Sequence, residues 1–273
     1  SIFTNEYHRT LPNHASPDTR AMLPVTELLL TLGAGAALGL FGGLFGIGGG
    51  IIAVPLLALG LGMPQSAAQG TALALMTPNL LMAWWRYHQR LAIDWRDMLA
   101  IALPGMLTTW GLAIFATRLD QAVLRIVFGV FLILLALRLL RARRHSDSAG
   151  ELPLQRRRLP VVGMVGGSSM GLLGIGGSLL ATPLLAGWLG QRQARAQGLA
   201  LALVAPSAAV ALATYAQAQQ VDWRLGLPLA AGGLFTVSAG VTLAHKLPER
   251  RMRKAFALVM LATGIWLSTA GLR

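Results

Sequence analysis

The sequence contains no cysteine, and this absence excludes several kinds of chemistry. A chain without thiols has no disulfide framework, no thiolate nucleophile and no cysteine ligand for a metal ion. Histidine does not replace it, because all five histidines lie in the polar N-terminal arm, in the middle linker or near the ends of apolar runs. We therefore expect neither a metal site nor a cofactor.

Charged residues are also scarce. Only 12% of the residues are charged, whereas a soluble domain carries roughly 25%. Apolar residues make up 55% of the chain, and the mean hydropathy is +0.60. The ten acidic residues lie in the arm, near the ends of apolar runs or in the linker: Glu6, Asp18, Glu27, Asp94, Asp97, Asp120, Asp147, Glu151, Asp222 and Glu249. This composition predicts an all-α polytopic membrane protein that has the lipid bilayer as a partner.

The net charge of +13 raises the alternative of a nucleic-acid partner. The arginines, however, cluster at the ends of apolar segments, as the orientation of membrane helices requires, and they form no basic face on a soluble domain. We therefore expect no nucleic-acid binding.

One glycine-rich pattern occurs twice, with a shift of 128 residues. The first copy spans residues 43–58 and the second spans residues 171–186, each with a glycine cluster followed by Pro-Leu-Leu-Ala. The same shift carries Pro78 onto Pro206 without a gap. Paired glycine interruptions in matching halves of a hydrophobic chain indicate the substrate site of a transporter.

Five apolar runs occur in each half: 24–43, 51–62, 66–85, 98–117 and 122–140, then 160–173, 179–190, 194–213, 226–245 and 253–271. The second run of each half has about a dozen residues, whereas a spanning helix needs about 20. It is therefore either a short helix that begins inside the membrane or part of a re-entrant hairpin. The chain divides into a polar arm (1–22), a first transmembrane repeat (23–140), a basic linker (141–159) and a second transmembrane repeat (160–273).

Positively charged residues distinguish two topologies. Five crossings per half make the halves inverted and place 17 of the 23 Lys and Arg residues on one face. Four crossings make the halves parallel and reduce that number to about 14, a weaker positive-inside bias. We therefore expect two inverted repeats of about five helices each in a bacterial inner membrane. The linker is then cytoplasmic and both termini lie outside.

The glycine clusters are expected near the membrane midplane. Unpaired backbone groups cost several kcal/mol in hydrocarbon, so non-helical backbone survives there only against protein or water. If the second and third runs form a hairpin that turns near Met63, Gly48 and Gly50 lie level with the residues beside Pro78. The shift of 128 places Gly176 beside Pro206 in the same way. Inversion then brings the two glycine-broken half-helices together.

Helix ends supply the chemistry of this site. A helix that begins after a glycine break offers free N–H groups and about half a positive charge, which together bind a small anion. The candidate substrate-binding residues are Gly48, Gly49, Gly50, Gln69, Thr71, Thr77, Asn79, Gly176, Gly177, Ser178, Gln197 and Ser207. The two glutamines either line the access path or hydrogen-bond to a neighbouring helix.

Other glycines recur at four-residue spacing and have a different expected role. They are Gly35, Gly39 and Gly43, with Gly163, Gly167 and Gly171 in the second half. Small residues at this spacing allow membrane helices to pack closely. We therefore assign them to helix packing.

The duplicated motif resembles the TauE/SafE sulfite exporter family, also called the TSUP transporters, over nearly the whole chain from about residue 25. The resemblance rests on Gly-x-Gly-Gly-Gly followed by proline, then a helix that opens Ala-x-Gln-Gly-Thr. The residues that carry it are Gly46, Gly48, Gly49, Gly50, Pro55, Gln69, Gly70 and Thr71, with Gly174, Gly176, Gly177, Pro183, Gln197 and Gly198 in the second copy. It implies transport, mostly outward, of small sulfur oxyanions and organosulfonates such as sulfite. The chain departs from the family where hydroxyls commonly follow the Gln-Gly pair, because Ala72 follows Thr71 and the second copy has Leu199 and Ala200.

Two rival functions stay open. A passive small-anion channel of the same fold would show the same sequence features. An intramembrane enzyme would use Ser169, in the Gly-x-Ser-x-Gly pattern of residues 167–171, but that pattern requires a strand-to-helix elbow. No histidine lies at depth to activate this serine, so we expect no enzyme. The oligomeric state is open, a homodimer included.

Overall fold

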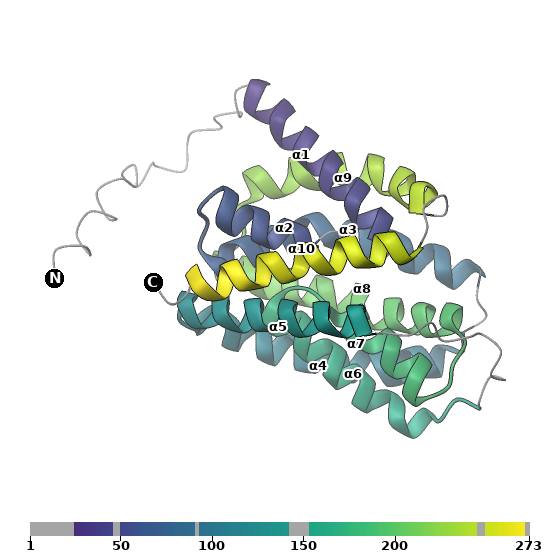
Figure 1. Ribbon diagram of the computed structural model, residues 1–273. Coiled ribbons are helices and arrows are strands. Elements are labelled where there is room, and N and C mark those ends of the chain that lie inside the picture. The colour runs from purple at the N-terminus through teal and green to yellow at the C-terminus, as the bar shows by residue number, and fades with distance from the viewer. Residues whose placement is uncertain (1–24, 46–49, 91–92, 142–152, 245–248, 271–273) are drawn as a thin grey trace.

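The computed structural model describes residues 25–45, 50–90, 93–141, 153–244 and 249–270, and in these ranges the chain is helical without a strand (Figure 1). The first half contains α1 (Val25–Phe45), α2 (Gly50–Pro55), α3 (Gln65–Arg90), α4 (Trp95–Arg118) and α5 (Gln121–Arg141). The second half contains α6 (Leu159–Leu173), α7 (Gly177–Pro183), α8 (Gln193–Gln217), α9 (Trp223–Ala244) and α10 (Glu249–Ala270). The all-α prediction is confirmed.

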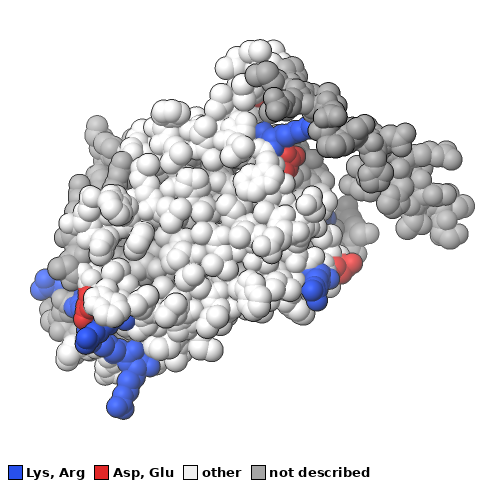
Figure 2. Space-filling model, turned by 180° about the vertical axis from the view of Figure 1, so that it is seen from behind, with Lys and Arg blue, Asp and Glu red and all other residues white. Residues whose placement is uncertain are grey.

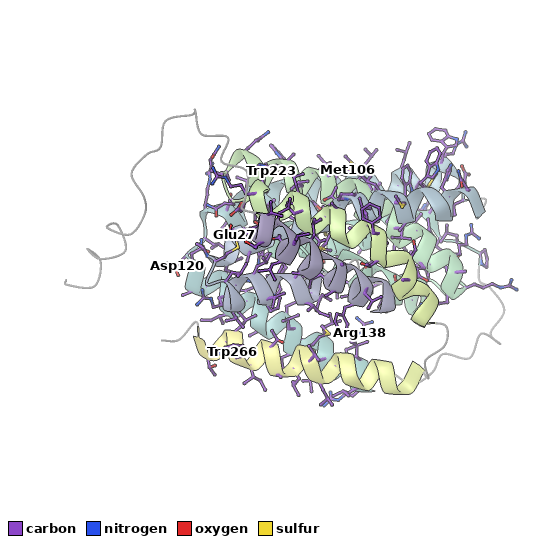
Figure 3. The ribbon with its side chains drawn as sticks, turned by 90° about the horizontal axis from the view of Figure 1, so that it is seen from above. Glu27, Met106, Asp120, Arg138, Trp223 and Trp266 are labelled. Atoms are coloured by element: carbon purple, nitrogen blue, oxygen red, sulfur yellow. The ribbon has the colours of Figure 1, made fainter. Side chains whose placement is uncertain are left out.

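The surface of the bundle is that of a polytopic membrane protein. α4, α5 and α8 are each long and apolar enough to cross a membrane. Large apolar side chains such as Leu107 and Phe235 point outward. The middle of the face in Figure 2 is free of charge, while its described charged side chains gather at the edges. Asp120, which precedes α5, and Arg138 near the end of α5 lie toward opposite ends of the bundle (Figure 3).

The two halves are inverted. Gln69, near the start of α3, contacts Tyr215, near the end of α8, so these equivalent helices run in opposite directions. α5 and α10 are also antiparallel, because Gly129 lies against Ser268 and Gly264 lies against Ile133. Equivalent helices of parallel halves would run in the same direction. The arrangement of five inverted segments per half is therefore confirmed, and the parallel alternative is wrong.

Two further helix pairs depend on the glycines at four-residue spacing. α1 packs against α9, where a carbon added to Gly35 would lie 2.4 Å from the Leu229 carbonyl oxygen. α4 packs against α6, where a carbon added to Gly163 would lie 2.2 Å from the Ile101 carbonyl oxygen. Gly39, Gly167 and Gly171 are equally close to the facing backbone, so the packing role is confirmed for these five glycines. The surroundings of Gly43 are not among those that the structure describes, so its packing role stays a prediction.

The short second run of each half forms a half-length helix. α2 continues into the π-helical turn η1 (Leu56–Gly60), and α7 continues into η3 (Leu184–Trp188). At 1.5 Å per residue each extends about 16–18 Å, roughly half of the hydrocarbon core. Pro55 and Pro183 occupy the junctions, where the missing N–H interrupts the regular ladder. The prediction of a short second helix in each half is confirmed.

We name the two ends of the bundle by their residues. The terminal face carries the starts of α1 and α3 and the end of α10, and it includes Ser66 and Gln220. The linker face carries the starts of α4, α6 and α8, and it includes Asp97 and Arg156. In Figure 1 the terminal face is at the left and the linker face is at the right.

Candidate functional site

Gly50, the last residue of the first glycine break, lies against the second break inside the bundle. A carbon added to Gly50 would lie 2.0 Å from Met76 Sδ and 2.6 Å from Ile175 Cγ2. Met76 stands two residues before the proline break of α3, and Ile175 lies within the second glycine break. The start of α2 therefore contacts the other half of the molecule, as the inverted hairpins predict. Gly48 and Gly49, together with Gly46 of the family motif, lie outside the described residues.

The second break is built from left-handed glycines. Gly174 ends α6 with a φ of 68°, and its N–H donates to the Met170 carbonyl oxygen at 2.9 Å. Gly176 precedes α7 with a φ of 87°. Residues with a Cβ rarely adopt this conformation, so both positions require glycine. The chain therefore reverses its direction within a few residues between α6 and α7.

α7 begins beside the proline of α8, as the hairpin predicts. A carbon added to Gly177 would lie 2.9 Å from Val204 Cγ2 and 3.1 Å from the Gly166 carbonyl oxygen. Val204 stands two residues before Pro206. Ser178 is half-buried in the first turn of α7. The N–H groups of this first turn point back along the helix axis and have no partner within their own helix.

Gln69 connects the first half to the second break. Its side chain is buried, and its Oε1 accepts a hydrogen bond from the Tyr215 hydroxyl at 2.9 Å. A carbon added to Gly174 would lie 3.3 Å from Gln69 Cβ. Of the two roles left open for this glutamine, the bond to a neighbouring helix is therefore the one observed. Its Nε2 is buried without a hydrogen-bond partner.

Tyr215 is a residue that the sequence analysis missed. The shift of 128 maps it onto Tyr87 and maps Gln69 onto Gln197. This correspondence of two tyrosines and two glutamines was the signal that could have identified the pair. Gln197 is half-buried. The side chain of Tyr87 lies outside the described residues.

Two equivalent polar residues follow the proline breaks. Asn79 and Ser207 are both buried, and each is the first residue after its proline. Asn79 Nδ2 donates to the Leu75 carbonyl oxygen at 3.3 Å, whereas Asn79 Oδ1 and Ser207 Oγ have no partner among the residues that the structure describes. An unsatisfied buried polar group costs about 1–3 kcal/mol, and one in a native protein indicates strain, a bound water or a ligand.

Thr77 and Thr71 differ in their positions. The Thr77 hydroxyl is buried beside Pro78 and donates to the Leu73 carbonyl oxygen at 2.7 Å, so its proton is already committed. The Thr71 hydroxyl accepts from the Asp222 N–H at 3.0 Å, at the turn between α8 and α9. The structure therefore does not bring Thr71 to the central cluster. The first turns of α3 extend to the terminal face, where this hydroxyl satisfies a loop amide.

Ser169 lies within α6, and its hydroxyl donates to the Gly166 carbonyl oxygen at 3.0 Å. The Gly-x-Ser-x-Gly pattern is thus helical here and does not form the elbow that presents a nucleophile.

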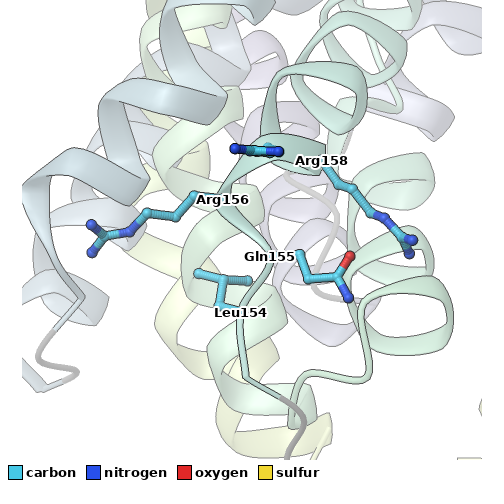
Figure 4. Close-up of a pocket in the computed structure, with 5 residues that line it drawn as sticks. Leu154, Gln155, Arg156 and Arg158 are labelled. Atoms are coloured by element: carbon cyan, nitrogen blue, oxygen red, sulfur yellow. The ribbon is translucent and has the colours of Figure 1, made fainter.

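A cavity of about 470 Å³ lies at the linker face, apart from the glycine breaks (Figure 4). Leu154, Gln155, Arg156, Arg157 and Arg158 line it, and the side chains of Arg156 and Arg158 point to opposite sides. Arg156 forms ion pairs with Asp94 and Asp97. The pKa of Asp94 lies below its ordinary value because its carboxylate accepts from the Arg96 N–H and pairs with Arg156. Burial opposes this shift.

Comparison with known proteins identifies the family. The family model for the sulfite exporter TauE/SafE matches residues 31–267. A "Probable membrane transporter protein" of Xylella fastidiosa is 27% identical over 263 residues, which cover 92% of this chain and 99% of the relative. A similarly named protein of Haemophilus influenzae is 26% identical over 263 residues, which cover 88% of this chain and 97% of the relative.

An archaeal relative matches a smaller part of the chain. A probable membrane transporter protein of Methanocaldococcus jannaschii is 28% identical over 165 residues, which cover 58% of this chain and 61% of the relative. No solved structure matches the chain. The family model covers most of the sequence, both repeats included, and the chain therefore belongs to the TauE/SafE sulfite exporter family of membrane transporters.

Proposed function

We propose that this protein carries a small sulfur-containing anion, such as sulfite or an organosulfonate, outward across the membrane. The anion binds where the two glycine breaks meet. The observation that carries this proposal is a pair of buried donors without partners in the described part of the chain: Gln69 Nε2, beside Gly174, and Ser207 Oγ, beside Pro206. A bound oxyanion would accept a hydrogen bond from either group.

Helix ends and the distribution of charge support an anion. The helical segment that begins at Gly177 presents N–H groups without intrahelical partners beside the second break, and we expect the same of the segment that contains Gly50. Among the described residues, the acidic side chains Glu27, Asp94, Asp97, Asp120 and Asp222 stand at or just before helix starts. Negative charge is thus absent from the described part of the centre. Asn79 Oδ1, an acceptor, suits a protonated oxygen of the substrate or a water molecule.

The charge bias supports the direction of transport. The sequence pattern predicts most Lys and Arg residues at the linker face, and this bias favours a cytoplasmic linker face in a cell with an inner membrane. An inside-negative potential favours outward movement of an anion by about 2.3 kcal/mol per charge per 100 mV. Export therefore needs no proton relay.

The passive channel is the second candidate, and the packing of the centre favours a carrier over it. Gln69, Thr77, Asn79 and Ser207 are all buried, whereas an open pore would expose its lining to water. Counterflow distinguishes the two. Proteoliposomes loaded with unlabelled sulfite should accumulate labelled sulfite transiently if the protein is a carrier, and a pore should show no such overshoot.

The binding site is tested by thermal unfolding of the purified protein with sulfite, sulfate, thiosulfate and small sulfonates. A ligand that binds only the folded state raises the unfolding temperature. We expect sulfite or a sulfonate to do so, and Ser207→Ala and Gln69→Leu to reduce the shift. Ser168→Ala is the matched control, because that hydroxyl bonds only to its own helix. The site is refuted if Ser207→Ala and Gln69→Leu show the same ligand-induced rise in unfolding temperature as the wild type and the control.

A further inference from the structure

Two hairpins with the same backbone are held in place by different chemistry. The first hairpin comprises α2, η1 and α3 (residues 50–90), and its tip reaches the terminal face. The second hairpin comprises α7, η3 and α8 (residues 177–217), and its tip reaches the linker face. The first hairpin packs against the glycine-packed pair α1–α9, and the second packs against the pair α4–α6. Movement of a hairpin tip relative to these pairs would open one face.

The second hairpin is attached to the α4–α6 pair by charge. Arg195, in the first turn of α8, lies 3.9 Å from the Asp97 carboxylate of α4. The Arg158 guanidinium, just before α6, lies 5.1 Å from the centre of the Trp188 ring at the end of η3. Asp97 is only 2% exposed and is also paired with Arg156, which keeps its carboxylate in position.

The first hairpin and the helices beside it lack the equivalents of these four side chains. The shift of 128 maps Asp97 onto Leu225, Arg195 onto Ala67, Arg158 onto Leu30 and Trp188 onto Gly60. All four equivalent positions are therefore apolar.

Neutral hydrogen bonds attach the first hairpin instead. Ser66, in the first turn of α3, donates from its hydroxyl to Gln220 Oε1 at 2.6 Å and from its N–H to Gln121 Oε1 at 3.0 Å. Thr71 accepts from the Asp222 N–H. The duplicated backbone thus carries a charged attachment at one face and a neutral attachment at the other.

We propose that Asp97, Arg195, Arg158 and Trp188 form a one-sided ionic gate that keeps the linker face closed. Release of Arg195 and Trp188 lets the second hairpin tip move away from α4 and α6, and the centre then opens to the linker face. The gate extends the proposed carrier function, because it decides which face opens. It does not depend on the identity of the anion.

The absence of cysteine makes a direct test practicable. Ser207→Cys places a single thiol at the buried centre with little change in volume. A membrane-impermeant thiol reagent is then applied to either face of sealed vesicles of known orientation. Labelling rates report how often the centre opens to each face, and they require no substrate.

Asp97→Asn should raise the labelling rate from the linker face by about fivefold or more, the lower end of typical coupling between sites. It should lower the rate from the terminal face, because the two open states compete. Arg195→Gln should reproduce this effect, and the double variant should add little to either single variant. Higher ionic strength should act in the same direction in the Ser207→Cys protein without further substitutions, because Arg195 is partly exposed to solvent.

Asp222→Asn is the matched control, since an asparagine keeps the cap of α9 and leaves the second hairpin untouched. The gate is refuted if Asp97→Asn and Arg195→Gln fold but leave linker-face labelling unchanged. Equal increases at both faces would also refute it, because they indicate general loosening. If sulfite fails to bind while the labelling changes as described, the proposed substrate is wrong and the gate stands.

Discussion

The two repeats share their backbone devices but differ in their side chains. Pro55 and Pro183 both precede a π-helical turn, and the glycine contact of Gly35 with Leu229 recurs as that of Gly163 with Ile101. The polar groups diverge. Backbone geometry must match in both halves for the inverted segments to pack, whereas each face and each half of the substrate site can hold its own chemistry. Changes to the shared backbone should therefore have large and equal effects in both halves, and changes to side chains should have smaller and unequal effects.

The largest effect is expected at the packing glycines. Gly35→Val and Gly163→Val each force a side chain into the facing backbone, which should cost about 3 kcal/mol of stability. Gly111→Val is the control, because nothing lies within 4 Å of its added carbon. Thermal unfolding in detergent measures the three variants. If one glycine variant unfolds like the control, the equivalence of the two helix pairs is wrong.

Gly176 should show the next largest effect. Gly176→Ala places a Cβ at a φ of 87° and 2.8 Å from the Phe131 ring. The backbone alone costs about 1–2 kcal/mol. Gly62→Ala shares the positive φ but has open space around it, so it isolates the backbone cost. We expect Gly176→Ala to destabilise more than Gly62→Ala in chemical denaturation, and equal effects would contradict the tight packing of the second break.

The tyrosine pair provides a smaller and more specific comparison. Tyr215→Phe leaves Gln69 Oε1 buried without its donor, which should cost about 1–3 kcal/mol. Tyr87→Phe should cost a similar amount if the shift of 128 reproduces the bond with Gln197. Unfolding of both variants measures this, with Gln69→Leu/Tyr215→Phe as a double variant. A Tyr215→Phe variant that is as stable as the wild type would contradict the observed bond.

The smallest effect concerns the linker face at low pH. The folded-state pKa of Asp94 is lowered, so the stabilisation by its carboxylate is fully present above its unfolded pKa, about 3.9. It is lost as the pH falls through the lower folded-state pKa. The unfolding temperature of Asp94→Asn should therefore lie below that of the wild type at neutral pH and approach it below about pH 4. A difference that grows on acidification would contradict this sign.

The apolar runs and the duplication were sufficient to predict the helices, and the distribution of Lys and Arg predicted their inversion. The first run was expected at 24–43, and α1 covers Val25–Phe45. The hairpin register placed Gly50 beside the proline segment of α3, and Gly50 contacts Met76. These features are local or are fixed by the repeat, so they can be read from one chain.

Contacts between the halves were less predictable. Tyr215 reaches Gln69 because α3 and α8 cross, and only the tertiary structure shows that crossing. Asp97 gave no signal, because its equivalent is Leu225 and it stands at a helix start like any capping residue. Thr71 was placed in the central cluster on the family motif, but its hydroxyl serves a loop amide. The duplication therefore predicts the backbone features that the two halves share, but it does not predict the side-chain contacts in which they differ.

The most direct measurement of the central claim is saturable binding of labelled sulfite to the purified wild type and to Gly177→Val. The added side chain would press against Val204 and the Gly166 carbonyl oxygen and would displace the first turn of α7 from the second break. The proposed site predicts saturable binding by the wild type that Gly177→Val abolishes while its helical circular dichroism is retained. Equal sulfite binding by both proteins would contradict a site at the glycine breaks. No binding of sulfite or any sulfonate by the wild type would contradict the proposed substrate.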